Sequence, residues 1–264
     1  MNDRVKLASG VTLNTRVDGA TGDPWLLLSN SLGANLSMWD PQIDELIRSY
    51  RVLRYDTRGH GDSDAPEGPY SLDTLVRDVV ELMDAHDIED AAFMGLSMGG
   101  MTGLGLALDH SDRVTRVVCA DGRADAPETF RAMWDQRIAA VEQGGLDAIV
   151  DGTLASWLTQ DWRDANPEQV QRIRSMVLAN DPLGYIACCR ALKGLDYLKR
   201  LNTVTIPVLF VGGSEDMGAS PEVMGAMAAA TPGGRYVEIP DAAHVANINR
   251  PEAFNAAIGE FLGV

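Results

Sequence analysis

Short apolar segments alternate with longer amphipathic or helix-favouring segments along most of the chain. The run Trp25–Ser29 is largely apolar, which is typical of a strand buried on both faces of a parallel sheet. The alternation predicts an α/β domain, with a mostly parallel sheet and helices on both faces. The predicted strands are Val11–Val17, Trp25–Ser29, Val52–Tyr55, Ala91–Leu96, Val114–Ala120, Pro207–Val211 and Arg235–Ile239; the predicted helices are Met38–Tyr50, one that Ser71 caps and that runs to about Asp84, Met98–Leu108, Glu222–Ala230 and Pro251–Leu262.

The alternation stops in the middle of the chain. From about Ala124 to Arg200 the pattern is helical throughout, and Pro127, Pro167 and Pro182 stand where the first turns of helices are expected. We interpret this stretch as a helical cap inserted into the α/β core. The predicted division is therefore a first part of the core at residues 1–123, the cap at 124–200 and a second part of the core at 201–264.

Composition narrows the partners and the compartment. The chain has 264 residues and a net charge of −16, which disfavours nucleic acid and anionic membrane surfaces as partners. Its three cysteines make an odd count and fit a reducing cytoplasm. Neither a secretory signal nor an apolar stretch of transmembrane length is visible. We expect a cytoplasmic protein that acts on a small molecule, and self-association into a homo-oligomer is compatible with the sequence.

The segment Gly95–Gly99 reads G-L-S-M-G and matches the pattern G-x-S-x-G between a predicted strand and a predicted helix. A sharp turn there lifts the Ser97 hydroxyl above the sheet edge, and the glycines allow neighbouring backbones to approach closely. The following helix points its N-terminus at the site, which favours negative charge. The pattern predicts Ser97 as a nucleophile.

A serine hydroxyl needs a base to remove its proton. Four histidines are present, and only His244 lies in a loop after the last predicted strand. His86 and His110 stand near helix ends, and His60 precedes the nucleophile. In α/β-hydrolases the order along the chain is Ser, acid, His, so His244 is the predicted base.

The acid is expected after a late strand, between Ser97 and His244. Asp216 follows the strand that begins at Pro207, and it is our first choice. Two alternatives remain open: Glu215 next to it, and Asp121 at the end of the Val114–Ala120 strand. The acid would hold the histidine in the correct tautomer and stabilise its imidazolium form.

Two backbone N–H groups should form an oxyanion hole. One is the Met98 amide, which directly follows the nucleophile. The other should lie in the loop 29–33 (SNSLG), and we assign it to Ser31, with Leu32 as the alternative one residue later.

With these residues in view, the chain resembles the 3-oxoadipate enol-lactonases, α/β-hydrolases of aromatic catabolism. The resemblance covers both halves of the predicted core and implies the α/β-hydrolase fold, a serine mechanism without cofactor or metal, and the triad Ser97, Asp216 and His244. The matching segments are 28–33 (LSNSLG), 38–40 (MWD), 52–61 (VLRYDTRGHG), 95–100 (GLSMGG), 242–244 (AAH) and 251–254 (PEAF).

One loop departs from this resemblance. Relatives often have Asn-Thr-Ala or a similar sequence where this chain has Asp121, Gly122 and Arg123, on the substrate side of the sheet. An enol-lactone carries a carboxylate, which an arginine near the start of the cap would bind. We take Arg123 and Trp134 as substrate-binding candidates, with Arg131, Arg137, Trp157 and Trp162 as alternatives.

The expected reaction is hydrolysis of a carboxylic ester or enol-lactone through an acyl-enzyme. Three alternatives are kept: a carboxylesterase for short acyl or aryl esters, a hydrolase of carbon–carbon bonds in ring-cleavage products, and a hydrolase-like ligand receptor with little turnover. Relative rates on neutral esters and on the lactone separate the first from the enol-lactonase. Tight binding without turnover would identify the receptor.

Overall fold

The computed structural model describes residues 2–264, so residue 1, at which the predicted core begins, lies outside the described residues. It contains one sheet of eight strands in the order β1-β2-β4-β3-β5-β6-β7-β8. The strands from β3 to β8 pair in parallel with one another, whereas β1 pairs antiparallel with β2 and β2 pairs antiparallel with β4. The prediction of a mostly parallel α/β sheet is confirmed. The strands are β1 (Asp3–Lys6), β2 (Thr12–Asp18), β3 (Trp25–Ser29), β4 (Arg51–Tyr55), β5 (Ala91–Leu96), β6 (Val114–Ala120), β7 (Val208–Gly213) and β8 (Arg235–Ile239).

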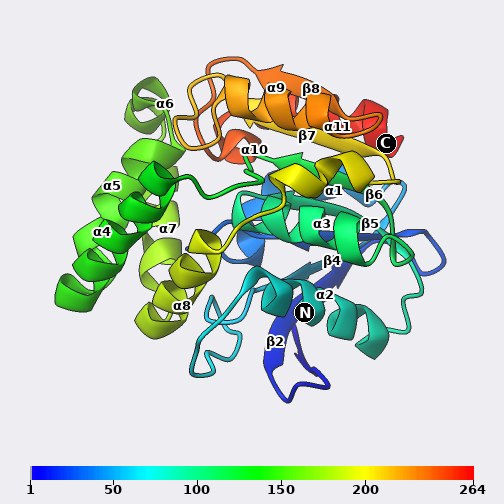
Figure 1. Cartoon of the computed structure of the whole chain (residues 1–264), viewed down its shortest axis with the longest axis horizontal. Coiled ribbons are helices and arrows are strands. Elements are labelled where there is room, and N and C mark those ends of the chain that lie inside the picture. Colours follow the sequence, from blue (N-terminus) through cyan, green and yellow to red (C-terminus); the bar gives the residue numbers. More distant parts are fainter. Residues whose placement is uncertain (1) are drawn as a thin grey trace.

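The central strands are buried because their side chains face helices on both sides. All residues of β5 and β7 are buried, as the apolar runs predicted. The helices form two groups (Figure 1): α2 packs against α3 on the near face, where α9 also lies, and α1 packs against α11 on the far face. These helices are α1 (Asp40–Leu46), α2 (Leu72–Ala85), α3 (Met98–Asp109), α9 (Pro221–Ala230), α10 (Ala246–Asn249) and α11 (Pro251–Leu262).

Three elements differ from the prediction, and one of them is the short helix α10, which lies in the stretch predicted as a loop before Pro251. The edge strand β1 was missed because it is short and mostly exposed, with only Val5 partly buried among its residues. The predicted helix Met38–Tyr50 is shorter: a 3₁₀ turn, η1 (Leu36–Trp39), comes first, and α1 ends at Leu46. Proline at the second position of α1 fits the first turn of a helix, and this marks the true start.

The middle of the chain is helical. Its five helices pack on one another and project from one edge of the sheet (Figure 1). The chain leaves and re-enters the core at adjacent points, since the amides of Tyr197 and Leu198 both donate to the carbonyl of Ala124, at 2.7 and 2.8 Å. The helices are α4 (Glu128–Gly144), α5 (Asp147–Trp157), α6 (Gln160–Ala165), α7 (Pro167–Leu178) and α8 (Pro182–Lys193), and a 3₁₀ turn, η2 (Leu198–Thr203), leads back to β7.

The helical segment is attached to the core by close backbone contact. A Cβ on Gly59, which has a φ of +77°, would lie 2.7 Å from the Cα of Gly184 in α8. The Asn180 side chain donates to the Gly33 carbonyl at 2.8 Å and accepts from the Gly61 amide at 3.0 Å. These contacts fix the segment over the carboxyl ends of β3 and β4.

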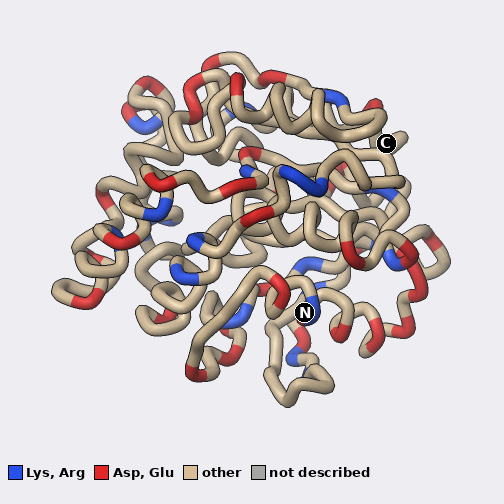
Figure 2. The backbone as a smooth tube through the Cα atoms, in the orientation of Figure 1, with Lys and Arg blue, Asp and Glu red and all other residues tan. Residues whose placement is uncertain are grey.

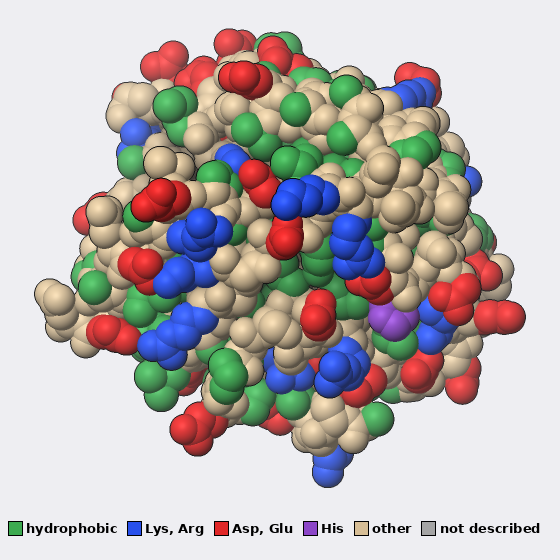
Figure 3. Space-filling model, in the orientation of Figure 1, with side chains coloured by type: hydrophobic (Ala, Val, Ile, Leu, Met, Phe, Trp, Pro, Cys, Tyr) green, Lys and Arg blue, Asp and Glu red, His purple; other side chains and the backbone are tan. Residues whose placement is uncertain are grey.

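The charges are distributed over the whole molecule. Acidic residues occur in both the core and the helical segment (Figure 2). On the face shown in Figure 3, Lys and Arg side chains are interspersed with Asp and Glu. Among residues 2–264, none of the helices has the length and apolar character needed to cross a membrane.

Candidate active site

Ser97 occupies the turn between β5 and α3 in a strained conformation, with φ 55° and ψ −113°. Its amide donates to the Ala120 carbonyl of the neighbouring strand at 2.8 Å, which fixes the turn. The glycines on each side permit this geometry. A Cβ on Gly95 would lie 2.2 Å from the Gly99 carbonyl, and one on Gly99 would lie 2.2 Å from the Ser29 carbonyl oxygen. The G-x-S-x-G pattern is thus a steric requirement of this turn.

Three residues from distant parts of the chain meet at this turn. His244 Nε2 lies 2.9 Å from Ser97 Oγ, and His244 Nδ1 lies 2.8 Å from Asp216 Oδ2. The second oxygen of Asp216 accepts from the amides of Gly218 and Ala219, at 2.7 and 3.1 Å. Because both carboxylate oxygens are engaged, the Asp216 side chain has one orientation, and it faces the ring of His244.

The charges of the two residues shift their pKa values in opposite directions. Burial alone would raise the pKa of Asp216, but the charge and hydrogen bond of His244 and the amides of Ala219 and Gly218 together hold that pKa below its usual range. Burial alone would lower the pKa of His244, but the charge and hydrogen bond of Asp216 and the charge of Asp121 together raise it. The pair therefore favours an imidazolium next to a carboxylate, which is the state formed when Ser97 gives up its proton.

The other three histidines lie elsewhere. His86 and His110 are the C-terminal cap residues of α2 and α3. His60 is buried, and burial lowers its pKa to about 4. Its Nδ1 lies 3.2 Å from the Arg58 carbonyl rather than near Ser97.

The loop after β3 lies against the start of α3, but its hydrogen bonds differ from the prediction for Ser31. The Ser31 amide donates to the sulfur of Met38 at 3.4 Å. The Leu32 amide donates to no acceptor within residues 2–264. The Met98 amide opens α3 and has no carbonyl one turn earlier in the helix to bond. The structure therefore favours Leu32 over Ser31 as the second donor, because the Ser31 amide is already engaged.

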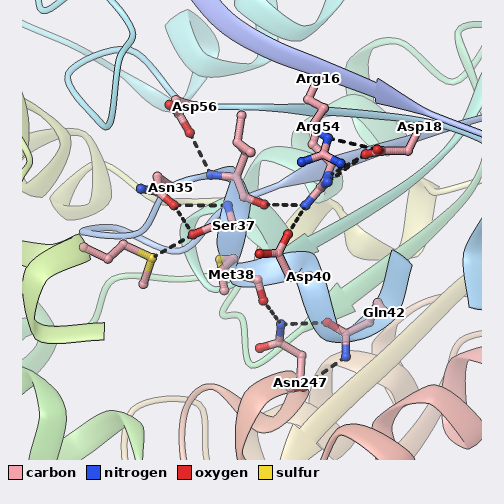
Figure 4. Close-up of polar contacts among 12 residues, drawn as sticks. Arg16, Asp18, Asn35, Ser37, Met38, Asp40, Gln42, Arg54, Asp56 and Asn247 are labelled. Atoms are coloured by element: carbon pink, nitrogen blue, oxygen red, sulfur yellow. Dashed lines mark hydrogen bonds and ion pairs between the residues drawn. The ribbon is translucent and has the colours of Figure 1, made fainter. Parts of the chain in front are cut away.

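A polar network holds this loop in place (Figure 4). The Arg54 guanidinium donates to Asp40 Oδ1 at 2.6 Å and to the Leu36 carbonyl at 3.2 Å. Asn247 donates to the Met38 carbonyl at 2.9 Å. The network fixes the backbone of Met38, the residue whose sulfur accepts from Ser31. The contact between the Ser31 amide and the Met38 sulfur could not be predicted from the sequence, because Met38 lies seven residues away and is brought near by a 3₁₀ turn.

A cavity of about 460 Å³ opens above Ser97, between the core and the helical segment. Apolar and aromatic side chains line most of it, with the candidate triad at its base. Its cations are Arg123 and Arg137. The lining includes Ser31, Leu32, Ser97, Asp121, Arg123, Met133, Trp134, Arg137, Trp157, Tyr185, Asp216, Met217 and His244.

The candidate substrate-binding residues are not equivalent. Arg123 forms an ion pair with Asp125 at 3.1 Å and donates to the Gly218 carbonyl at 2.8 Å, so its charge is already compensated. Arg137 donates to the hydroxyls of Tyr185 and Thr153, and no carboxylate within residues 2–264 pairs with it. The geometry therefore disfavours the prediction for Arg123 and favours Arg137, one of the alternatives.

The tryptophans and Arg131 divide in the same way. Trp134 lines the cavity and stacks edge-on with Phe130, at 5.6 Å between ring centroids, and Trp157 also lines it. Trp162 and Arg131 lie outside the lining, and Arg131 donates to the Ala126 carbonyl. Among the described residues, no cluster of three or more His, Cys, Asp or Glu side chains is arranged to hold a metal ion.

Comparison with known proteins agrees with this architecture. The sequence model of the protein family described as the α/β hydrolase fold matches residues 24–251 of this chain. The chain is 36% identical over 251 residues to the 3-oxoadipate enol-lactonase 2 of Acinetobacter baylyi. The aligned region covers 95% of this chain and 93% of that protein. The crystal structure of the enol-lactonase from Burkholderia xenovorans LB400 superposes with a TM-score of 0.96 at 39% identity, over 99% of this chain and 100% of that chain.

An esterase structure is also similar. The thermophilic esterase from Thermogutta terrifontis superposes with a TM-score of 0.91 at 28% identity, over 100% of this chain and 98% of that chain. An enol-lactonase structure and an esterase structure thus both superpose on nearly the whole of this chain. The chain belongs to the α/β-hydrolase fold family, and within that family it is similar to the 3-oxoadipate enol-lactonases.

Proposed function

We propose that this protein hydrolyses a carboxylic ester or enol-lactone through an acyl-enzyme on Ser97, and that its substrate is the enol-lactone type of aromatic catabolism. The observation that carries the proposal is the continuous chain of hydrogen bonds from Ser97 through His244 to Asp216 at the base of a largely apolar cavity. Enol-lactonase relatives with the same fold and length support the substrate type.

The residues would act in the following order. His244 takes the proton of Ser97 as its oxygen attacks the substrate carbonyl, and Asp216 stabilises the imidazolium that forms. His244 then gives the proton to the leaving oxygen, which stays on the same molecule in a lactone. Water finally attacks the acyl-serine with His244 as base again. The Leu32 and Met98 amides would bind the oxyanion in both halves of the reaction.

Arg137 is our candidate for binding the substrate carboxylate. Its two neutral hydroxyl partners orient the guanidinium but leave its charge uncompensated in a cavity of largely apolar walls. An anionic group is the partner that such a cation favours, through a charge-assisted hydrogen bond. Trp134, three residues earlier in α4, would supply an apolar wall beside it.

The proposal is tested by steady-state kinetics of Ser97→Ala on 3-oxoadipate enol-lactone and on p-nitrophenyl acetate. Loss of the nucleophile should lower kcat by about 10⁴-fold or more on both substrates. Ser175→Ala is the control, because Ser175 is an exposed residue of α7 and its removal should leave both rates unchanged. Near-normal rates in Ser97→Ala would exclude the acyl-enzyme mechanism.

A simple carboxylesterase is the second candidate, and the apolar cavity wall favours it. The similar Thermogutta esterase shows that the fold at this size also serves ester hydrolysis. The same kinetic comparison decides between the two. A kcat/KM for neutral p-nitrophenyl acetate far above that for the lactone would identify an esterase.

A further inference from the structure

Asp121 is a fully buried carboxylate beside the candidate triad. It directly follows β6, and its backbone has a positive φ of 45°, a conformation that residues other than glycine rarely adopt. Its amide donates to the Val211 carbonyl of β7 at 2.8 Å. Such local strain persists only where the surrounding structure holds it, and here the hydrogen bonds of the Asp121 side chain help to hold it.

Both oxygens of Asp121 accept from backbone amides of two other segments. Oδ1 accepts from the Gly213 amide at 2.8 Å, and Oδ2 accepts from the Ala246 amide at 3.3 Å. Gly213 ends the strand that leads to Asp216, and Ala246 stands two residues after His244. One carboxylate thus joins the segment that carries the acid to the segment that carries the base.

Hydrogen bonds hold the loop on both sides of His244. Before the histidine, the loop is held by the Glu215 amide, which donates to the Ala242 carbonyl at 2.8 Å. After it, the Val245 amide donates to the Trp157 carbonyl of the helical segment at 3.1 Å, and Asp121 is the contact that ties Ala246 to the end of β6 in the core. A Cβ on Gly213 would lie 2.3 Å from the Ala242 carbonyl oxygen, so the two loops touch directly at this point.

We propose that Asp121 is a positioning residue for the reaction: it fixes the distance between Asp216 and His244 by tying both loops to the end of β6. This inference rests on the proposed function. It replaces the alternative in which Asp121 is itself the acid, because the Nδ1 atom of His244 bonds Asp216 and both oxygens of Asp121 are occupied by amides.

The test is Asp121→Asn, which keeps the shape of the side chain but presents an NH₂ to one of the two amides. We expect kcat on p-nitrophenyl acetate to fall about 10- to 100-fold, because small misplacements of a base cost that much, with KM little changed. The charges that act on His244 are those of Asp216, Asp121 and Arg137. Burial and the Asp216 charge raise the pKa of Asp121 well above its usual range, whereas His244 and the amides of Gly213 and Ala246 favour its charged form. In the pH range where Asp121 is ionised, the asparagine variant lacks one negative charge beside His244, which should move the acid limb of kcat/KM to lower pH.

Asp78→Asn is the matched control. Asp78 is a buried carboxylate of α2 that pairs with Arg58, and it does not line the cavity. This substitution should lower the melting temperature without moving the acid limb. Asp121→Ser, a smaller side chain, repeats the test if the asparagine variant does not fold.

The proposal is overturned if a folded Asp121 variant keeps kcat within about twofold, or loses activity only in step with stability and with an unmoved acid limb. A Ser97→Ala enzyme that stays active would instead overturn the proposed function, so the two failures are distinguishable.

Discussion

Removing the charge of Arg137 should change which substrates the enzyme accepts. The perturbation is Arg137→Gln, which can still donate to the Tyr185 hydroxyl, the partner of Arg137 Nε at 2.6 Å. It removes the only cation in the lining whose charge is not compensated by a neighbouring carboxylate within the described residues. A carboxylate substrate would then meet no positive charge at this wall.

The magnitude follows from the contact that is lost. A hydrogen bond to a charged group contributes about 1.5–3 kcal/mol, which corresponds to about 10- to 150-fold in kcat/KM. The full Coulomb energy of two charges at 4 Å and an effective dielectric of 20, about 4 kcal/mol, is an upper bound because the substrate must also lose its hydration. The cavity is open to solvent at its mouth, which also favours the lower range.

The assay compares two esters with the same leaving group. The p-nitrophenyl monoester of glutaric acid carries a carboxylate, whereas p-nitrophenyl valerate has an acyl chain of the same length without one. We expect Arg137→Gln to lower kcat/KM about 10- to 150-fold on the first and less than about threefold on the second. Arg131→Gln is the control, because Arg131 lies on the same helix outside the cavity lining.

An equal loss on both esters would refute this reasoning. It would show that Arg137 only supports Tyr185 and Thr153 in the helical segment. No loss on either ester would place the carboxylate site elsewhere in the cavity.

Two further predictions concern pH and packing. Burial opposes the imidazolium, but the charge and hydrogen bond of Asp216 and the charge of Asp121 together raise the pKa of His244, so kcat/KM should rise with pH through a value above that of free imidazole. The stabilisation by this pair is complete below the unfolded-state pKa of about 6.5 and should be lost as the pH rises through the folded-state pKa, as melting curves recorded beside the pH profile would show. Gly59→Ala should lower the free energy of unfolding, measured in urea, by about 1–3 kcal/mol, because the added Cβ would meet the backbone of Gly184. Gly10→Ala is the control and should cost less, because Gly10 also has a positive φ but open space around it. Equal losses in the two variants would show that backbone strain alone is responsible.

The sequence predicts best those residues whose chemistry is fixed by local backbone geometry. Gly95, Ser97 and Gly99 are required by one turn, so their spacing alone locates the elbow. The parallel order of strands then places the loops after β7 and β8 at the same edge, and Asp216 and His244 follow from that order. The strand Trp25–Ser29 was placed correctly for a related reason, since its side chains are buried on both faces.

The residues that the sequence does not resolve depend on contacts between distant segments. Ser31 and Leu32 are equally plausible donors in the sequence, and only the Met38 sulfur, brought in by a 3₁₀ turn, distinguishes them. Arg123 and Arg137 are both arginines near the start of the helical segment. Asp125 compensates Arg123, whereas no carboxylate among residues 2–264 pairs with Arg137, and no pattern in the sequence indicates this difference.

The charge of the whole molecule and the charge of the cavity act over different distances. A net charge of −16 repels an anion, but salt at physiological strength screens exposed charges beyond about 8 Å. Inside a cavity with largely apolar walls, a single guanidinium is screened much less, so Arg137 can dominate the local potential although the protein is acidic. The net charge therefore repels large polyanions, and it leaves a small carboxylate substrate fully compatible with this site.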